Sequence, residues 1–173
     1  MGDPRRLRNK YERPKKLLDL ARIQEEKSFK RDYSLKNMRE LWVSTQELKK
    51  YRREARRLLS LSDEERKSDT GKIITKLNHL GVLPKDAKLD DILSLTVKDI
   101  LERRLQTLVL RKGLARTMRQ SRQLITHGFI SVNGKVISRP SYILDVDEEG
   151  KIGYSKSIDI SVKAPSESSP AKN

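Results

Sequence analysis

Cysteine is absent from this 173-residue chain, which excludes disulfide bonds and zinc sites built from cysteine. Aromatic residues are also few, with one Trp, five Tyr and two Phe. No stretch approaches the roughly 18 consecutive apolar residues that a membrane-spanning helix needs. The N-terminal residues lack the apolar core of a secretory signal peptide, so we expect a cytosolic protein with no membrane partner.

Hydrophobic residues are scarce as well, at 35% of the chain. That fraction is lean for a self-sufficient fold, although it exceeds what full disorder would require. We therefore expect small cores, together with long segments that become ordered mainly against a partner. The sequence contains no internal repeat.

Positive charge, by contrast, is abundant: Lys and Arg total 39 against 24 Asp and Glu, a net charge of +15. Residues 1–60 carry a net charge of +10 and residues 101–140 carry +8. The intervening residues 61–100 carry −1, and residues 141–173 carry −2. A generic soluble surface mixes its signs more evenly. Two separated basic blocks therefore predict an extended contact with a polyanion, in the first place a nucleic acid.

The first basic block begins with residues 1–14, which two prolines and few apolar side chains mark as an extended arm. A disordered, solvated tail is the alternative interpretation. The cations that we expect this arm to place on nucleic acid are Arg5, Arg6, Arg8, Lys10 and Arg13.

Residues 15–31 are predicted to form a short helix that buries Leu17 and Leu18, followed by an irregular connector over residues 32–43. Ser44 and Glu47 have the spacing of a capping box, which predicts that the next helix starts there. Apolar residues fall on one face of that helix. Its opposite face carries Lys49, Lys50, Arg52, Arg53, Arg56 and Arg57. These like charges repel one another, and a bound phosphate backbone would relieve the repulsion; a plain solvated face is the alternative.

The nearly neutral segment, residues 61–100, is predicted to pack within the fold rather than to bind nucleic acid. Ser62 and Glu65 suggest a second capping box that opens a short acidic turn. Residues 70–80 are predicted to be a helix ended by Gly81, and residues 82–95 to be a loop followed by a small apolar group.

The second basic block has the clearest local signals. Thr96 and Asp99 resemble a capping box for one helix that runs as far as Gly113, and Thr117 with Gln120 predicts a second helix that Gly128 ends. Alternating apolar residues on both sides of Asn133–Gly134 predict a tight hairpin. Residues 151–154 predict a further strand, residues 158–162 could add an edge strand, and disorder is expected beyond residue 163.

Most candidate RNA ligands of this block lie on the two helices and the hairpin. One apolar stripe contains Arg104, which could instead be an internally paired side chain. His127 could cap carbonyls or pack rather than touch RNA. The candidates are Arg103, Arg104, Arg116, Thr117, Arg119, Gln120, Arg122, Gln123, His127 and Lys135. Two distant histidines make a metal site improbable, and we expect no catalytic residues, cofactor or small-molecule substrate.

Residues 101–144 resemble the RNA-binding domain of the small-subunit ribosomal protein S-four family. The matching elements, in order, are Arg103–Arg104–Leu105, Gly113, Arg122–Gln123, His127, Val132–Asn133–Gly134 and Pro140–Ser141–Tyr142. The N-terminus resembles the archaeal and eukaryotic branch. That likeness rests on Pro4, Arg5, Arg6, Lys10, Tyr11, Pro14 and Lys15. The chain lacks the zinc cysteines of some bacterial members, and Gln106 stands where this domain commonly carries Asp.

The resemblance implies a non-enzymatic structural constituent of the small ribosomal subunit. Such proteins bind small-subunit ribosomal RNA directly, help to nucleate assembly, support translational accuracy and lie beside other ribosomal proteins. The expected fold is α+β, with a mainly helical N-terminal region followed by a small RNA-binding domain of two helices packed on a short antiparallel sheet. The expected divisions are an arm (1–14), a helical domain (15–95), the RNA-binding domain (96–163) and a disordered tail (164–173).

Three other functions are compatible with a basic chain of this kind. An RNA-modifying enzyme can carry the same small domain, but it needs a separate catalytic domain that residues 1–95 do not suggest. A transient RNA chaperone or ribosome-rescue factor and a duplex-DNA binder are the other two. Few aromatic side chains are interleaved with the charge, which argues against a base-stacking platform and favours structured RNA read by its backbone and shape.

Overall fold

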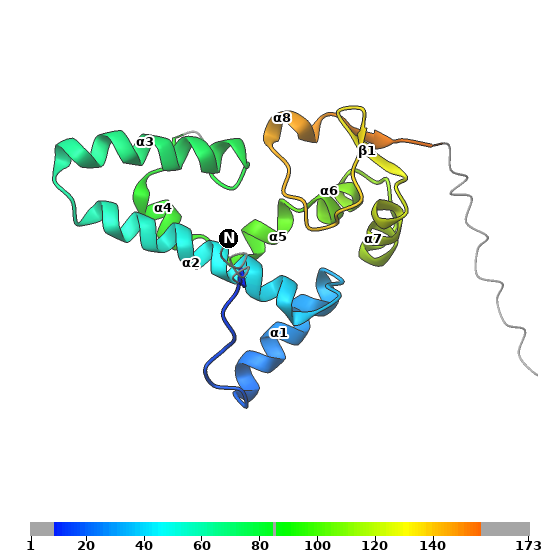
Figure 1. Ribbon diagram of the computed structural model, residues 1–173, viewed down its shortest axis with the longest axis horizontal. Coiled ribbons are helices and arrows are strands. Elements are labelled where there is room, and N and C mark those ends of the chain that lie inside the picture. The colour runs from blue at the N-terminus through cyan, green and yellow to red at the C-terminus, as the bar shows by residue number, and fades with distance from the viewer. Residues whose placement is uncertain (1–8, 85, 157–173) are drawn as a thin grey trace, which may run out of the picture.

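The computed structural model describes residues 9–84 and 86–156, and over these residues the chain is an α+β protein, as predicted. Eight helices and three strands follow one another in these residues (Figure 1). The helices are α1 (Leu20–Asp32), α2 (Met38–Leu59), α3 (Asp63–His79), α4 (Leu89–Ser94), α5 (Val97–Glu102), α6 (Leu105–Arg111), α7 (Met118–Thr126) and α8 (Val146–Glu149). The strands are β1 (Ile130–Val132), β2 (Lys135–Val136) and β3 (Ile152–Tyr154).

The helical region is built on α2, a helix of 22 residues against which α1, α3, α4 and α5 all pack (Figure 1). Leucines recur on one face of α2 at helical spacing, so that face turns inward. Its core comprises Leu48, Ala55, Leu58, Leu77, Leu83, Ala87, Leu89, Ile92, Leu95 and Ile100. Because Ile100 belongs to this core, α5 packs with the helical region, and the boundary at residue 95 stays a proposal.

The C-terminal module places α6 and α7 against a three-stranded antiparallel sheet of order β2-β1-β3. Its separate core comprises Leu105, Leu108, Val109, Ala115, Leu124, Ile125, Ile130, Val132, Leu144 and Ile152. Asn133 and Gly134 have φ of 52° and 78°, so both turn positions are left-handed, as the predicted tight hairpin requires. The strand predicted over residues 151–154 is confirmed as β3.

Two of the predicted helix starts are confirmed. At the start of α5, Asp99 accepts hydrogen bonds from the backbone and hydroxyl of Thr96, at 2.7 and 2.9 Å. At the start of α7, Thr117 Oγ1 accepts from the backbone N–H of Gln120 at 3.1 Å. The helix ends at Gly81, Gly113 and Gly128 all have positive φ, as predicted.

The predicted burial of Leu17 and Leu18 is wrong, since their exposed fractions are 69% and 90%. The helix begins only at Leu20, because Asp19 caps it by accepting a hydrogen bond from the backbone N–H of Arg22 at 3.4 Å. The two leucines therefore precede the helix instead of lying on its inner face.

The irregular connector and the capping box at Ser44 are also corrected. Helix α2 begins at Met38, and Leu41 is already buried on its inner face. Ser44 lies inside the helix, where its hydroxyl donates to the carbonyl of Glu40 at 3.3 Å. The capping-box spacing was coincidental, because the apolar period of α2 extends upstream of it.

Three further element boundaries differ from the prediction. Helix α3 runs without a break from Asp63, so the acidic turn and the helix at 70–80 are one element, and α4 forms within the predicted loop. The single helix predicted from Val97 divides into α5 and α6, because Arg104 has extended backbone angles and pairs with Ile143. The edge strand at 158–162 and the tail at 164–173 lie outside the described residues.

Candidate nucleic-acid interface

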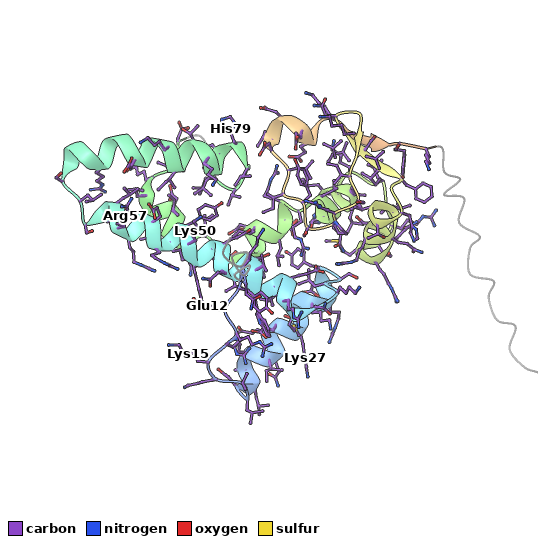
Figure 2. All side chains as sticks on the ribbon, in the orientation of Figure 1. Glu12, Lys15, Lys27, Lys50, Arg57 and His79 are labelled. Atoms are coloured by element: carbon purple, nitrogen blue, oxygen red, sulfur yellow. The ribbon has the colours of Figure 1, made fainter. Side chains whose placement is uncertain are left out.

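Five cations form an exposed face along α2, which we call the α2 cation face: Lys49, Lys50, Arg53, Arg56 and Arg57. At helical spacing these cations lie on the side of α2 opposite its buried leucines, so packing of the leucines turns the cations toward solvent. Figure 2 labels Lys50 and Arg57 on this helix. Arg57 also pairs with Glu54 at 2.8 Å, an exposed contact that water screens.

Arg52, predicted as part of the same face, is placed differently. Its side chain is half-buried, and Nη2 donates to the backbone carbonyl of Leu95 at 2.5 Å. This bond ties α2 to the end of α4. Arg52 therefore has a structural contact that its neighbours on the α2 cation face lack.

The described part of the arm runs beside α2. The ring of Tyr11 lies 5.8 Å from the ring of Trp42, at an angle of 38°. Trp42 Nε1 in turn donates to Glu26 on α1 at 3.3 Å. Lys10 and Arg13 flank this contact and are exposed, while Arg5, Arg6 and Arg8 lie outside the described residues.

A second exposed group lies on α7 and the hairpin, and we call it the α7–hairpin face: Arg116, Arg119, Gln123, His127 and Lys135. Thr117 is exposed beside it and caps α7. Gln120 Oε1 accepts from the backbone N–H of Arg116 at 2.8 Å, so Gln120 also shapes the turn before α7. The cap and the turn fix where Arg116 and Arg119 lie at the positive end of the α7 dipole.

Two predicted RNA ligands are instead joined to one carboxylate. Glu40 on α2 accepts from Arg104 Nη2 at 2.9 Å and from Arg122 Nη2 at 2.5 Å. Arg104 is only 4% exposed, which is the internally paired alternative that its place in the apolar stripe suggested. Burial alone would raise the pKa of Glu40, but the hydrogen bonds from the two arginines outweigh it and lower the pKa below its usual value.

Gln106 completes this network. Its side chain is 1% exposed, and Nε2 donates to the carbonyls of Met118 at 2.9 Å and Tyr33 at 3.2 Å. Its Oε1 accepts from Arg122 Nη1 at 3.4 Å. The amide thus keeps an acceptor for Arg122 and adds donors that a carboxylate could not supply.

Arg103, a further predicted RNA ligand, also holds the fold together. Its Nε donates to the carbonyl of Leu80 at 2.7 Å, and its Nη1 pairs with Glu149 at 2.9 Å. A Cβ atom at Gly81 would lie 2.7 Å from the guanidinium carbon of Arg103. Arg103 therefore fills the space beside the end of α3 and links it to α8.

Sequence reasoning missed Glu40 as the hub and Glu47 beside it. The two acids are seven residues apart, two helical turns, and so lie on the same face of α2. Both are among the few acids of a strongly basic segment. Acids that align with the buried stripe of a basic helix were the signal that could have found them.

Neither histidine gathers potential metal ligands around it. His79 and His127 are both exposed, and Figure 2 shows His79 at the end of α3. Among the side chains that the structure describes, no group of three or more His, Asp or Glu is placed to hold a metal ion. No helix in the described part of the chain has both the length and the hydropathy that a membrane crossing would require.

Comparison with known proteins gives one consistent answer. The family model described as "S4 domain" matches residues 103–149. A protein of Ignicoccus hospitalis, named small ribosomal subunit protein uS4, is 46% identical over 154 residues, which cover 89% of this chain and 93% of that protein. Proteins of the same name from Saccharolobus solfataricus and Saccharolobus islandicus are 48% and 47% identical over 155 residues, 89% of this chain and 86% of theirs.

Proposed function

The chain belongs to the uS4 family of small ribosomal subunit proteins, and we propose that it is a structural constituent of that subunit which binds the subunit's ribosomal RNA directly. The proposal rests on the difference between two sets of cations, one exposed to solvent and one used within the fold. The α2 cation face and the α7–hairpin face are exposed, whereas Arg52, Arg103, Arg104 and Arg122 hold elements of the fold together.

The two faces contact RNA through its backbone. Structured RNA hides its major groove, so proteins grip its phosphates and 2′-hydroxyls and read its shape. The planar guanidinium of an arginine forms two hydrogen bonds to one phosphate. Arg53 and Arg56 on α2, and Arg116 and Arg119 at α7, are the side chains that take this role. The predicted arm, with Lys10 and Arg13, extends the contact.

The finer parts of the role follow from the family resemblance. The protein helps to nucleate assembly of the small subunit, supports translational accuracy and lies beside other ribosomal proteins in the cytoplasm. It works without catalysis, cofactor or small-molecule substrate. Its relatives carry the name of a ribosomal protein, which supports a structural rather than an enzymatic role.

Salt titration of binding to a transcript of the organism's own small-subunit ribosomal RNA tests the mechanism. With on the order of 6–10 phosphate contacts, affinity should fall by about 10³–10⁵ between 50 and 200 mM salt. Arg53→Gln with Arg56→Gln, and Arg116→Gln with Arg119→Gln, should each reduce the log–log slope by about two. A flat titration overturns the proposal.

A matched control keeps the loss of charge separate from the loss of contact. Lys30→Gln with Lys98→Gln removes the same charge from exposed positions on α1 and α5, outside both faces. We expect this pair to leave the slope within about half a unit of the unaltered protein's slope. Equal effects of all three pairs would show that net charge, and not these two faces, determines binding.

Sedimentation distinguishes a permanent constituent from a transient factor. After a high-salt wash, the protein should remain with the small subunit at one copy per particle. Release by the wash supports an RNA chaperone or rescue factor instead. Catalytic turnover on ribosomal RNA would favour a modifying enzyme, and equal competition by duplex DNA would favour a DNA binder.

A further inference from the structure

A hollow of about 300 Å³ lies where the arm, α2 and the C-terminal module meet. Its lining includes Lys10 from the arm, Val43 and Glu47 from α2, Arg104 from the turn before α6, and Ser141 and Ile143 from the segment after the hairpin. The volume is at the lower end of ligand pockets, which suits one small planar group. Apolar, anionic and cationic side chains thus surround a single space.

Glu47 brings to this hollow a carboxylate that lacks a bonding partner among the described residues. Its side chain is half-buried, and within the described part of the chain it has no hydrogen bond or ion pair. Burial raises the pKa of Glu47, although Lys10, Arg104, Lys50 and Lys76 oppose the rise. A carboxylate that loses water without gaining a donor is unfavourable for folding, so its presence calls for a ligand that donates hydrogen bonds.

Arg104 supplies the complementary group. Its Nη2 is used by Glu40, but among the described residues its buried Nη1 has no hydrogen-bond partner. Buried donors are satisfied in the great majority of native structures, and each exception requires an explanation. An acceptor on a ligand in the hollow would provide the missing partner after a small movement of the side chain.

We propose that this hollow binds one unstacked guanine of the ribosomal RNA, held by Glu47 and Arg104; the proposal rests on the RNA-binding role above. Guanine presents two neighbouring donors, N1–H and the N2 amino group, which match the two oxygens of the Glu47 carboxylate. Its O6 lies next in line, where the guanidinium of Arg104 donates. Val43 and Ile143 offer apolar contacts to the ring.

The other three bases lack this order of groups along their Watson–Crick edges. Adenine places the acceptor N1 where the carboxylate needs a donor, and uracil offers one donor between two acceptors. Cytosine offers one amino group beside two acceptors. Unstacked bases read on this edge are the usual means of sequence recognition in RNA. Lys10 is placed to hold the phosphate of the same nucleotide.

Titration of the full-length protein with guanosine 5′-monophosphate tests the pocket without ribosomal RNA. We expect shifts of the backbone amide signals of residues 43–47 and 141–143, with affinity about tenfold greater than for adenosine 5′-monophosphate. Glu47→Gln should abolish that preference, because its amide places a donor against the donors of guanine. Glu25→Gln, an exposed acid on α1, should leave it unchanged.

Kethoxal, which modifies N1 and N2 of unpaired guanine, tests the pocket in the complex with the ribosomal RNA transcript. The unaltered protein and Glu25→Gln should protect one guanine that Glu47→Gln leaves at least about fivefold more reactive. Identical patterns with Glu47→Gln overturn the pocket, as does equal binding of the two mononucleotides. Failure of the unaltered protein to bind the transcript overturns the proposed function instead, and the mononucleotide titration still decides the pocket.

Discussion

Glu40 joins the helical region to the C-terminal module, so its replacement should destabilise the whole fold. Glu40→Gln keeps the shape of the side chain but removes the charge that balances Arg104 and Arg122. Arg104 is only 4% exposed, so water can replace little of the lost ion pair. The variant therefore leaves the buried guanidinium of Arg104 without its ion-pair partner.

The size of the effect follows from how much solvent reaches the network. Removing one partner of a buried ion pair costs about 3–5 kcal/mol. The side chains of Glu40 and Arg122 each keep 21% exposure, so water screens part of the loss, and we expect about 2–3 kcal/mol. Urea denaturation followed by circular dichroism should show a midpoint lower by about 1–2 M, at a slope of about 1.5–2 kcal/mol per M.

The matched control is Glu54→Gln, which breaks the pair with Arg57. The two side chains of this pair are 40% and 58% exposed. Its loss should cost less than about 0.5 kcal/mol, because exposed pairs contribute little. The reasoning about Glu40 is refuted if the two variants have the same urea midpoint at pH 7.

The pH dependence supplies a second check on Glu40. Its pKa is lowered on folding from the reference value of 4.5, so its stabilisation is fully present above pH 4.5 and is lost as pH falls through the lowered pKa. The gap in stability between the unaltered protein and Glu40→Gln should therefore narrow on acidification below pH 4.5. A gap that widens would contradict the assignment of the ion pair.

Four further substitutions test other features of the fold by urea or thermal denaturation. Gly81→Ala should lower the free energy of unfolding by about 2 kcal/mol, because φ is +67° and the added Cβ would meet Arg103. Its control is Gly71→Ala inside α3, where the added Cβ meets nothing within 4 Å. This control should stabilise the fold by about 0.5–1 kcal/mol. Thr117→Ala should cost about 1 kcal/mol by removing the cap of α7, and an unchanged midpoint would argue against that cap. Folding raises the pKa of Glu47 above 4.5, so the ionised carboxylate destabilises the fold at higher pH. Glu47→Gln should therefore melt at the same or a higher temperature than the unaltered protein at pH 7. A lower melting temperature would contradict a raised pKa at Glu47.

The parts of the fold that the sequence predicted are those fixed by neighbouring residues. The cap at Thr117, the left-handed glycine after α6 and the turn at Asn133–Gly134 each depend on bonds or backbone angles within a few positions. Such local rules need no knowledge of the rest of the chain. The family resemblance, which depends on the order of these elements, also identified the fold class correctly.

The errors occurred where a distant segment decides the outcome. The break between α5 and α6 arises because Arg104 pairs with Ile143, 39 positions further along the chain. Helical periodicity placed Arg104 in an apolar stripe but could not show that Glu40 is its partner. The predicted burial of Leu17 is wrong for a related reason. Whether an apolar side chain is buried depends on which other segments pack against it, and the local sequence does not show this.

Arginine serves two purposes in this chain: some arginines face solvent, and others join parts of the fold. The helical region and the C-terminal module have separate small cores, and a third cluster lies around Leu41 and Leu101. Arg104 and Arg122 connect the C-terminal module to α2 through their ion pairs with Glu40, and Arg103 links α3 to α8. A long side chain that packs its stem and keeps its charge paired suits such a junction. Net charge therefore overstates the RNA-binding surface of a lean basic protein, and the cations to assign to RNA are the exposed ones that do not join one element of the fold to another.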